Sequence, residues 1–232
     1  MSSLVTKCTA LYKDLKEIIT LDGPAGVGKT TLARQVAEAL DMVYLDTGAM
    51  FRALAWVLGE SCLSLDQTGL TEQLAALHFT LTGTGQASTL FLNGQPLNSN
   101  IRTETIALLA SRYAQLPAVR DFLRIAQRDI SVGTPLTAEG RDMGTVVFPN
   151  ARWKFLLDAV PKERAHRRWH QLIDLGQPAD LTELSKQIYQ RDYLDRTRTM
   201  SPLIPAEDAV IIDTTNLTVE DVLKRILRVV RQ

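Results

Sequence analysis

The sequence predicts an α/β protein in which a parallel sheet carries helices on both faces and a small antiparallel insertion interrupts the chain. Short apolar segments alternate with amphipathic helical segments along most of the 232 residues, which is the pattern of a parallel sheet covered by helices. A glycine-rich loop follows the first apolar segment. The insertion is indicated by two β-type segments and an Asn-Gly turn within this alternation.

The first half of the chain begins with a clear strand signal. Ile18 to Leu21 is a short apolar run that stops at Asp22, Gly23 and Pro24, as expected for a buried strand entering a loop. The next elements are predicted from apolar periodicity: a helix at 30–40, a strand at 42–45, a helix at 49–58 capped by Asp46 and Thr47, a helix at 71–77, strands at 79–81 and 89–92, and helices at 105–115 and 118–130.

The second half continues the alternation. We expect strands at 135–138, 154–157 and 210–212, and helices at 162–175, 181–196 and 219–230. Residues 1–16 are mixed and polar, and we interpret them as an N-terminal extension before a domain at 17–232. The change of character places the insertion at about 63–103.

Composition excludes several classes of protein. Lys plus Arg and Asp plus Glu both number 26, so a dedicated duplex nucleic-acid binder is not expected. The two cysteines, Cys8 and Cys62, form no metal-binding pattern and are interpreted as free thiols. Neither a signal peptide nor an apolar stretch of ~18 residues is present. We therefore expect a cytoplasmic monomer with no membrane or nucleic-acid partner.

The loop after the first strand matches a phosphate-binding pattern. Gly23-Pro24-Ala25-Gly26-Val27-Gly28-Lys29-Thr30 fits G-x-x-x-x-G-K-[ST], the P-loop of P-loop NTPases. Its glycines let backbone N–H groups surround an anion, and the following helix presents its positive end to the phosphates. Lys29 would contact the β- and γ-phosphates, and the Thr30 hydroxyl would ligate Mg²⁺. The sequence thus predicts a nucleoside triphosphate site with magnesium.

Arginines away from this loop favour a kinase over a switch or a motor. No N-K-x-D guanine reader is found, whereas a second anionic substrate requires further cations. Arg52 and Arg141 both follow predicted strand ends, where open α/β sheets bind ligands. Other arginines share helix faces, where solvated salt bridges are the alternative interpretation: Arg164, Arg167 and Arg168 on one helix, and Arg191 and Arg198 with Asp195 on another.

These segments together resemble the bacterial cytidylate (CMP) kinases of the nucleoside monophosphate kinase superfamily. The resemblance is carried by the 23–29 loop, by Leu45-Asp46-Thr47-Gly48-Ala49-Met50-Phe51-Arg52, by Ile101-Arg102-Thr103, by the run from Glu139 to Pro149, by Arg164-Ala165-His166-Arg167-Arg168, and by Arg191 to Arg198. It spans about residues 18–230. The 139–149 run is its most specific part.

The resemblance implies roles for individual residues. Residues 23–31, ending at Thr31, would hold the phosphates of ATP. Thr47 and Arg52 would lie beside the monophosphate of CMP or dCMP, and Arg141 would bridge toward the transferred group. Ser111, Arg120 and Asp142 would read cytosine. Arg191 and Asp195 would lie near the ribose, and Arg198 would be a further arginine of the acceptor site. Lys29, Arg141, Arg167 and Arg168 would supply catalytic charge, the last two from a lid at about 162–195. Glu139, often aspartate in relatives, would hold Mg²⁺ through water.

The implied reaction moves the γ-phosphoryl group of Mg-ATP to CMP or dCMP, giving ADP and CDP or dCDP. The acceptor phosphate is already anionic at neutral pH because its second pKa is ~6, so no general base is needed. Two alternatives stay open. One is another small-acceptor P-loop kinase of the shikimate or adenylate type; the other is a non-catalytic nucleotide switch, which would not need the acceptor-side arginines.

Overall fold

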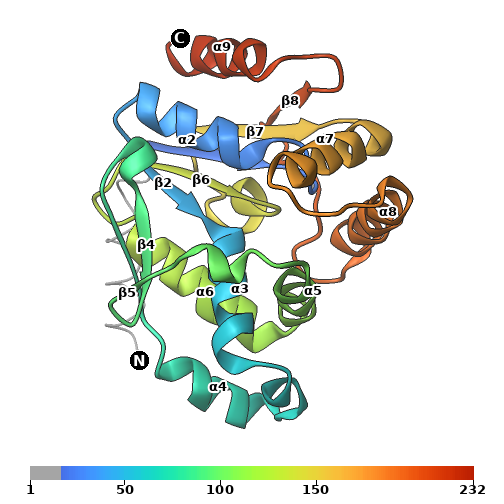
Figure 1. Ribbon diagram of the computed structural model, residues 1–232. Helices are drawn as coiled ribbons and strands as arrows, with labels where there is room; N and C mark the ends of the chain where they lie inside the picture. Colours follow the sequence, from blue (N-terminus) through green and yellow to red (C-terminus); the bar gives the residue numbers. More distant parts are fainter. Residues whose placement is uncertain (1–16) are drawn as a thin grey trace.

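The computed structural model describes residues 17–232; the predicted extension at 1–16, with Cys8, lies outside the described residues. Its main sheet is parallel and has the order β2-β6-β1-β7-β8, and a second, antiparallel sheet has the order β3-β4-β5 (Figure 1). The main strands are β1 (Ile18–Asp22), β2 (Val43–Asp46), β6 (Leu136–Gly140), β7 (Trp153–Asp158) and β8 (Val210–Asp213); the small sheet holds β3 (Phe79–Thr82), β4 (Thr89–Leu92) and β5 (Gln95–Pro96). The predicted fold class is confirmed.

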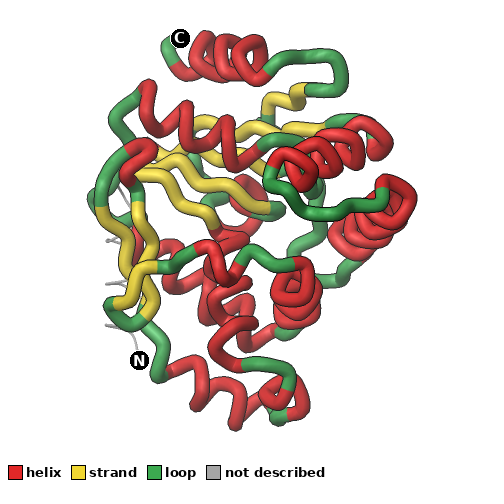
Figure 2. The backbone as a smooth tube through the Cα atoms, viewed as in Figure 1, coloured by secondary structure: helices red, strands yellow, loops and turns green. Residues whose placement is uncertain are grey.

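Helices cover both faces of the main sheet, with α2 and α9 on one side and α3 and α6 on the other (Figures 1 and 2). The α-helices are α2 (Lys29–Ala39), α3 (Thr47–Leu58), α4 (Gln67–Ala75), α5 (Glu104–Tyr113), α6 (Pro117–Ile130), α7 (Pro161–Asp174), α8 (Leu181–Thr197) and α9 (Val219–Val230). Asp46 alone caps α3, by accepting a hydrogen bond from the Ala49 N–H, and Thr47 is already helical. Within residues 17–232, no helix has the length and apolar character of a membrane span.

Several short helices were not predicted. They are the 3₁₀ helices η2 (Ser61–Ser64), η3 (Gly85–Ala87) and η4 (Ser99–Ile101), and the π-helix η5 (Met143–Val147). Elements of three to five residues are too short to show an apolar period, so sequence patterns do not reveal them. The π-helix matters for function, because it directly follows the charged segment at the end of β6.

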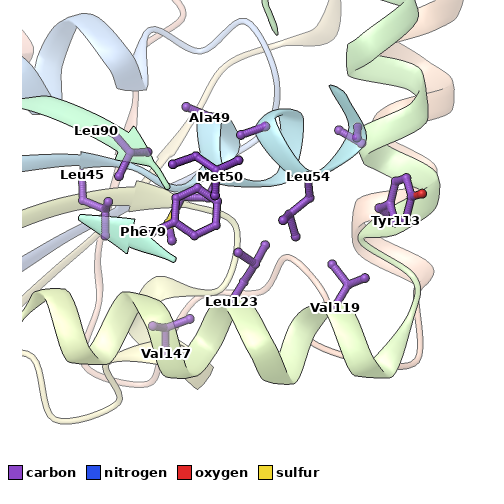
Figure 3. Packing of buried hydrophobic residues seen from close by; sticks show 14 of the residues in the cluster. Leu45, Ala49, Met50, Leu54, Phe79, Leu90, Tyr113, Val119, Leu123 and Val147 are labelled. Carbon is purple, nitrogen blue, oxygen red and sulfur yellow. The ribbon is translucent and has the colours of Figure 1, made fainter. Parts of the chain in front are cut away.

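Two apolar cores fix the sheet between its helices. On one face Ile19 and Leu21 of β1 share a buried cluster with Val36 of α2 and Ile226 of α9. On the other face a cluster joins β2 to α3, α6 and the small sheet, and includes Leu45, Met50, Leu54, Leu123 and Phe79 (Figure 3). The insertion is therefore packed onto the same core as strand β2. Its boundaries at about 63–103 stay a prediction.

The strand register brings the charged residues to one edge of the sheet. Asp22 pairs with Gly140 between β1 and β6, and Asp46 pairs with Glu139 between β2 and β6. All three strands are parallel, so their carboxyl ends meet at this edge.

Candidate active site

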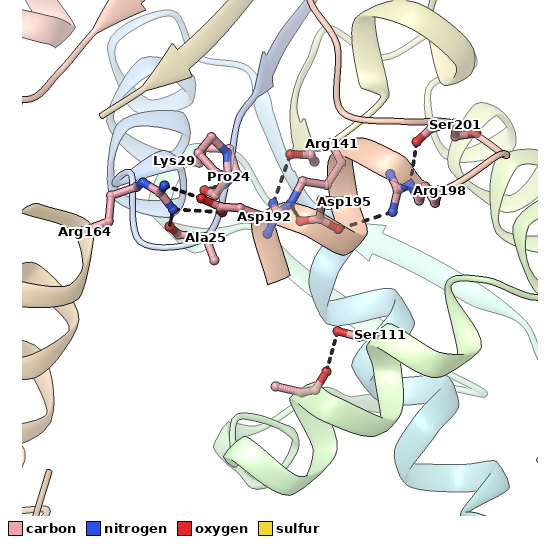
Figure 4. Close-up of polar contacts among 12 residues, drawn as sticks. Pro24, Ala25, Lys29, Ser111, Arg141, Arg164, Asp192, Asp195, Arg198 and Ser201 are labelled. Carbon is pink, nitrogen blue, oxygen red and sulfur yellow. Dashed lines mark hydrogen bonds and ion pairs between the residues drawn. The ribbon is translucent and has the colours of Figure 1, made fainter. Parts of the chain in front are cut away.

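The P-loop joins the end of β1 to the start of α2. Gly23 has a φ of +155°, and a Cβ there would lie 2.2 Å from the Leu157 carbonyl oxygen, so only glycine fits. Gly28 has a φ of +94° and directly precedes α2, whose first residue is Lys29. The Lys29 ammonium is buried and donates a hydrogen bond of 2.7 Å to the Pro24 carbonyl (Figure 4). The loop curls around the lysine and the helix points its N-terminus at this position, as phosphate binding requires.

The ionisation of Lys29 is strongly perturbed. Burial and, after it, the charge of Arg141 lower the pKa of Lys29 to about 7, while Glu139, Asp195 and Asp22 oppose the shift. A polyphosphate next to the ammonium would favour its charged form and raise that pKa again.

This coupling predicts that ATP binding takes up protons. At pH 8 the free protein holds Lys29 mostly neutral, whereas the ATP complex would hold it charged, so about one proton should be absorbed per ATP bound. Calorimetric titrations in buffers of different ionisation enthalpy measure this uptake. Lys29→Arg serves as the matched control, because arginine stays charged in both states. Equal proton uptake by both proteins would contradict the assignment.

Glu139 is the acidic side chain next to the P-loop. It is buried at the end of β6, and burial raises the pKa of Glu139, as does the nearby Asp46, while Lys29 and hydrogen bonds from Tyr44 and Thr30 lower it. The Thr30 hydroxyl therefore lies near the Glu139 carboxylate. This pair of oxygen ligands fits Mg²⁺, which uses few protein groups and completes its shell with water and phosphate oxygens.

Asp22 fixes the segment that follows β6. Its carboxylate accepts hydrogen bonds from the backbone N–H groups of Met143, at 2.9 Å, and Gly144, at 2.8 Å. Burial raises the pKa of Asp22 to about 6, against the lowering effect of these two bonds. Strand β1 thus anchors the start of η5 and with it the neighbouring residues Arg141 and Asp142. Sequence reasoning did not assign Asp22 this role.

Arg141 lies in a network with the helix α8 (Figure 4). Its Nε donates to Asp195 at 2.7 Å, and Asp195 also accepts a longer bond of 3.5 Å from Arg198. Burial would raise the pKa of Asp195, but Arg141, Arg198 and Arg191 together hold it below its ordinary value. Arg191 lies near the same charges. Burial has the largest effect in lowering the pKa of Arg191, and the charge of Arg141 has the second largest. The structure brings these four predicted residues together.

A second arginine cluster forms around Asp46. The Asp46 carboxylate pairs with Arg52 at 3.1 Å and with Arg102 at 2.9 Å. Burial would raise the pKa of Asp46, but these two arginines outweigh it and hold that pKa below its ordinary value. Thr47 lies beside them and donates to the Glu139 carbonyl at 2.7 Å. Arg102 was noted only as part of a motif, and its role beside Asp46 was missed because 56 residues separate the two.

Arg120 and Asp142 are buried and face one another at 3.5 Å. Both line a small cavity, together with Phe51 and Met143. Ser111 is not part of this pair: its hydroxyl donates to the Ala107 carbonyl of its own helix, and in Figure 4 it lies apart from the Arg141 network. The predicted role of Ser111 in base reading stays a prediction.

Several arginines of the acceptor side each have one nitrogen atom without an internal hydrogen-bond partner. Among residues 17–232, six buried side-chain nitrogen or oxygen atoms have no hydrogen-bond partner, and three of these are guanidinium nitrogens. They are Arg52 Nε, Arg120 Nε and Arg198 Nη2. An unpaired buried donor is costly, so these atoms are suited to oxygen or nitrogen acceptors of a ligand.

The predicted lid arginines have different roles in the structure. Arg164 is buried, donates to the carbonyls of Ala25 and Ala159, and pairs with Asp192 of α8, so it links the P-loop to α7 and α8. Arg167 donates to Thr214 and Thr215 after β8, and Arg168 pairs with Glu104 at the start of α5. Neither of these two contacts the P-loop here, and their catalytic role stays a prediction.

A family model and the similar sequences of known proteins indicate one family. Residues 19–232 match the model of the family described as cytidylate kinase. The cytidylate kinase of Maridesulfovibrio salexigens is 55% identical over 214 residues, covering 92% of this chain and 96% of the relative. That of Oleidesulfovibrio alaskensis is 54% identical over 210 residues, covering 90% and 96%. Among solved structures, a shikimate kinase from Bacteroides thetaiotaomicron covers 93% of this chain and 98% of its own at 13% identity, with a TM-score of 0.47. The chain belongs to the cytidylate kinase family.

Proposed function

We propose that this protein transfers the γ-phosphoryl group of ATP, bound with Mg²⁺, to CMP or dCMP and releases ADP with CDP or dCDP. The observation that carries the proposal is the presence of two separate cationic sets at one sheet edge. Lys29 and the P-loop form one, and the arginines with unpaired buried nitrogens form the other. A nucleotide switch would need only the first set.

The residues present can account for the reaction. The acceptor phosphate oxygen is anionic at neutral pH and needs no base. The difficulty is to bring two polyanions together, and this requires fixed positive charge and in-line placement. Lys29 would hold the donor phosphates, Arg52 the acceptor phosphate, and Arg141 would lie between them. Arg167 and Arg168 would have to leave their present partners, Thr214 and Glu104, and turn toward the phosphates.

Magnesium is proposed between Thr30 and Glu139. When bound, the ion would neutralise phosphate charge; the two side chains would hold it directly and through water, respectively. Among residues 17–232 no group of three or more His, Cys, Asp or Glu could hold a metal on its own. A site completed by the phosphates of ATP needs no such group.

The base preference is assigned to Asp142. A carboxylate can accept a hydrogen bond from the amino group of cytosine, whereas uracil presents a carbonyl oxygen at that position. Asp142→Ala should therefore reduce the preference for CMP over UMP by roughly 10-fold or more. In this variant, bound UMP would no longer leave a buried carboxylate without a hydrogen-bond donor. Steady-state kinetics with both acceptors measure this ratio. Glu60→Ala, which removes an exposed ion pair of 3.3 Å with Arg112, is the control. An unchanged ratio in Asp142→Ala would contradict the role.

The proposed function is tested by offering Mg-ATP with CMP, dCMP, UMP, AMP and shikimate in separate reactions. Turnover with CMP and dCMP, and little with the others, is expected. A preference for AMP or shikimate would support kinase activity but contradict the assignment of CMP and dCMP as acceptors.

A cytoplasmic location and a monomeric state also stay predictions. Light scattering after gel filtration tests the monomeric state.

A further inference from the structure

Tyr44 connects the acceptor-side insertion to the carboxylate of Glu139, which lies next to the P-loop. It lies in β2 with only 2% of its surface exposed. Its hydroxyl donates a hydrogen bond to Oε1 of Glu139 in the neighbouring strand β6. In the register of these strands Tyr44 pairs with Thr137, so its ring extends toward the carboxyl end of β6, two residues beyond its own pairing position.

Tyr44 is itself held by two contacts. Its backbone N–H donates to the Ser88 hydroxyl at 2.9 Å, at the end of the turn between β3 and β4. The guanidinium carbon of Arg34, in α2, lies 4.8 Å from the centre of its ring, a cation–π distance. The phenol therefore has little freedom, and its hydroxyl is fixed in front of Glu139.

Glu139 needs such support more than a shorter acid would. A glutamate side chain has one more rotatable bond than an aspartate, so its carboxylate must be fixed by its surroundings. The Thr30 hydroxyl lies near it on the P-loop side, and Asp46 and Lys29 are the charged groups with the largest effects on its pKa. The Tyr44 hydroxyl restrains the carboxylate from the β2 side of the sheet.

We propose that Tyr44 is a positioning residue that orients the Glu139 carboxylate toward Thr30 and the phosphates of Mg-ATP. The inference rests on the proposed function, in which Glu139 holds Mg²⁺ through water. Outer partners that orient metal-binding groups commonly change metal affinity or activity by roughly 10- to 100-fold when removed.

The test is Tyr44→Phe, which removes only the hydroxyl. The control is Tyr113→Phe, since Tyr113 is also a buried tyrosine and its hydroxyl donates to the Gly59 carbonyl at 2.7 Å, on the acceptor side. The readout is the ratio of ATP dissociation constants without and with Mg²⁺, measured by calorimetry without acceptor. We expect this ratio to fall roughly 10-fold in Tyr44→Phe and to stay unchanged in Tyr113→Phe.

A second variant separates positioning from general packing. Aspartate in Glu139→Asp is too short to keep the Tyr44 contact, so adding Tyr44→Phe to it should change the Mg²⁺ ratio less than twofold. An equal loss in both backgrounds, or a Tyr44→Phe protein that loses thermal stability but keeps the wild-type ratio, would overturn the inference. If Mg²⁺ does not strengthen ATP binding even in the wild-type protein, the proposed magnesium site itself fails.

Discussion

Replacing Lys29 with methionine is expected to lower kcat/KM by roughly 10³- to 10⁵-fold. The substitution removes the buried ammonium that donates to the Pro24 carbonyl of the P-loop. Because burial disfavours the charged form of Lys29, its removal should leave the unfolding temperature unchanged or raise it. Steady-state kinetics with CMP and thermal denaturation measure the two effects.

The control for this substitution is Lys224→Met on the exposed surface of α9. It changes the formal charge of the protein by the same amount and should retain wild-type kinetics. A Lys29→Met protein with less than a tenfold loss in kcat/KM would contradict the assignment of Lys29 to the donor phosphates.

Replacing Arg141 with glutamine is expected to lower kcat by roughly 10³-fold, with a smaller change in the KM for ATP. Arg141 lies at the end of β6, between the P-loop and Asp195, so its charge is placed where donor and acceptor phosphates would meet. Asp195 keeps Arg198 as a partner in the variant, which limits the structural damage. Pre-steady-state kinetics separate the chemical step from binding.

Arg112→Gln is a suitable comparison for Arg141→Gln. Arg112 is 58% exposed and pairs with Glu60 at 3.3 Å on the surface, and such pairs contribute little. Its kinetics should remain those of the wild type. A rise in KM for ATP with unchanged kcat in Arg141→Gln would show that Arg141 only binds the donor.

Local patterns explain what the sequence could predict. The P-loop is a continuous segment, and its strand, loop and helix follow from residues adjacent in the chain, so the position of Lys29 was predictable. The helical spacing of Arg191, Asp195 and Arg198 likewise predicted one shared face. Strand order could not be read from local patterns.

The contacts that were missed depend on that strand order. Tyr44 meets Glu139, 95 residues away, only because β2 lies beside β6. Asp22 reaches Met143 and Gly144 because β6 also lies beside β1. The partners of Arg167 and Arg168 depend on how α7 packs, and helical spacing gives no information on that. Sequence patterns therefore gave the residue types of the site but not the network that holds them.

The most direct test of the account follows the γ-phosphoryl group itself. ATP labelled at the γ-phosphate is mixed with Mg²⁺, CMP and the wild-type protein, and the products are separated. Transfer to CMP would place the label in the β-phosphate of CDP, at a rate that depends on CMP. Label released as inorganic phosphate at a rate independent of CMP would contradict it, and would instead indicate a nucleotide hydrolase or switch.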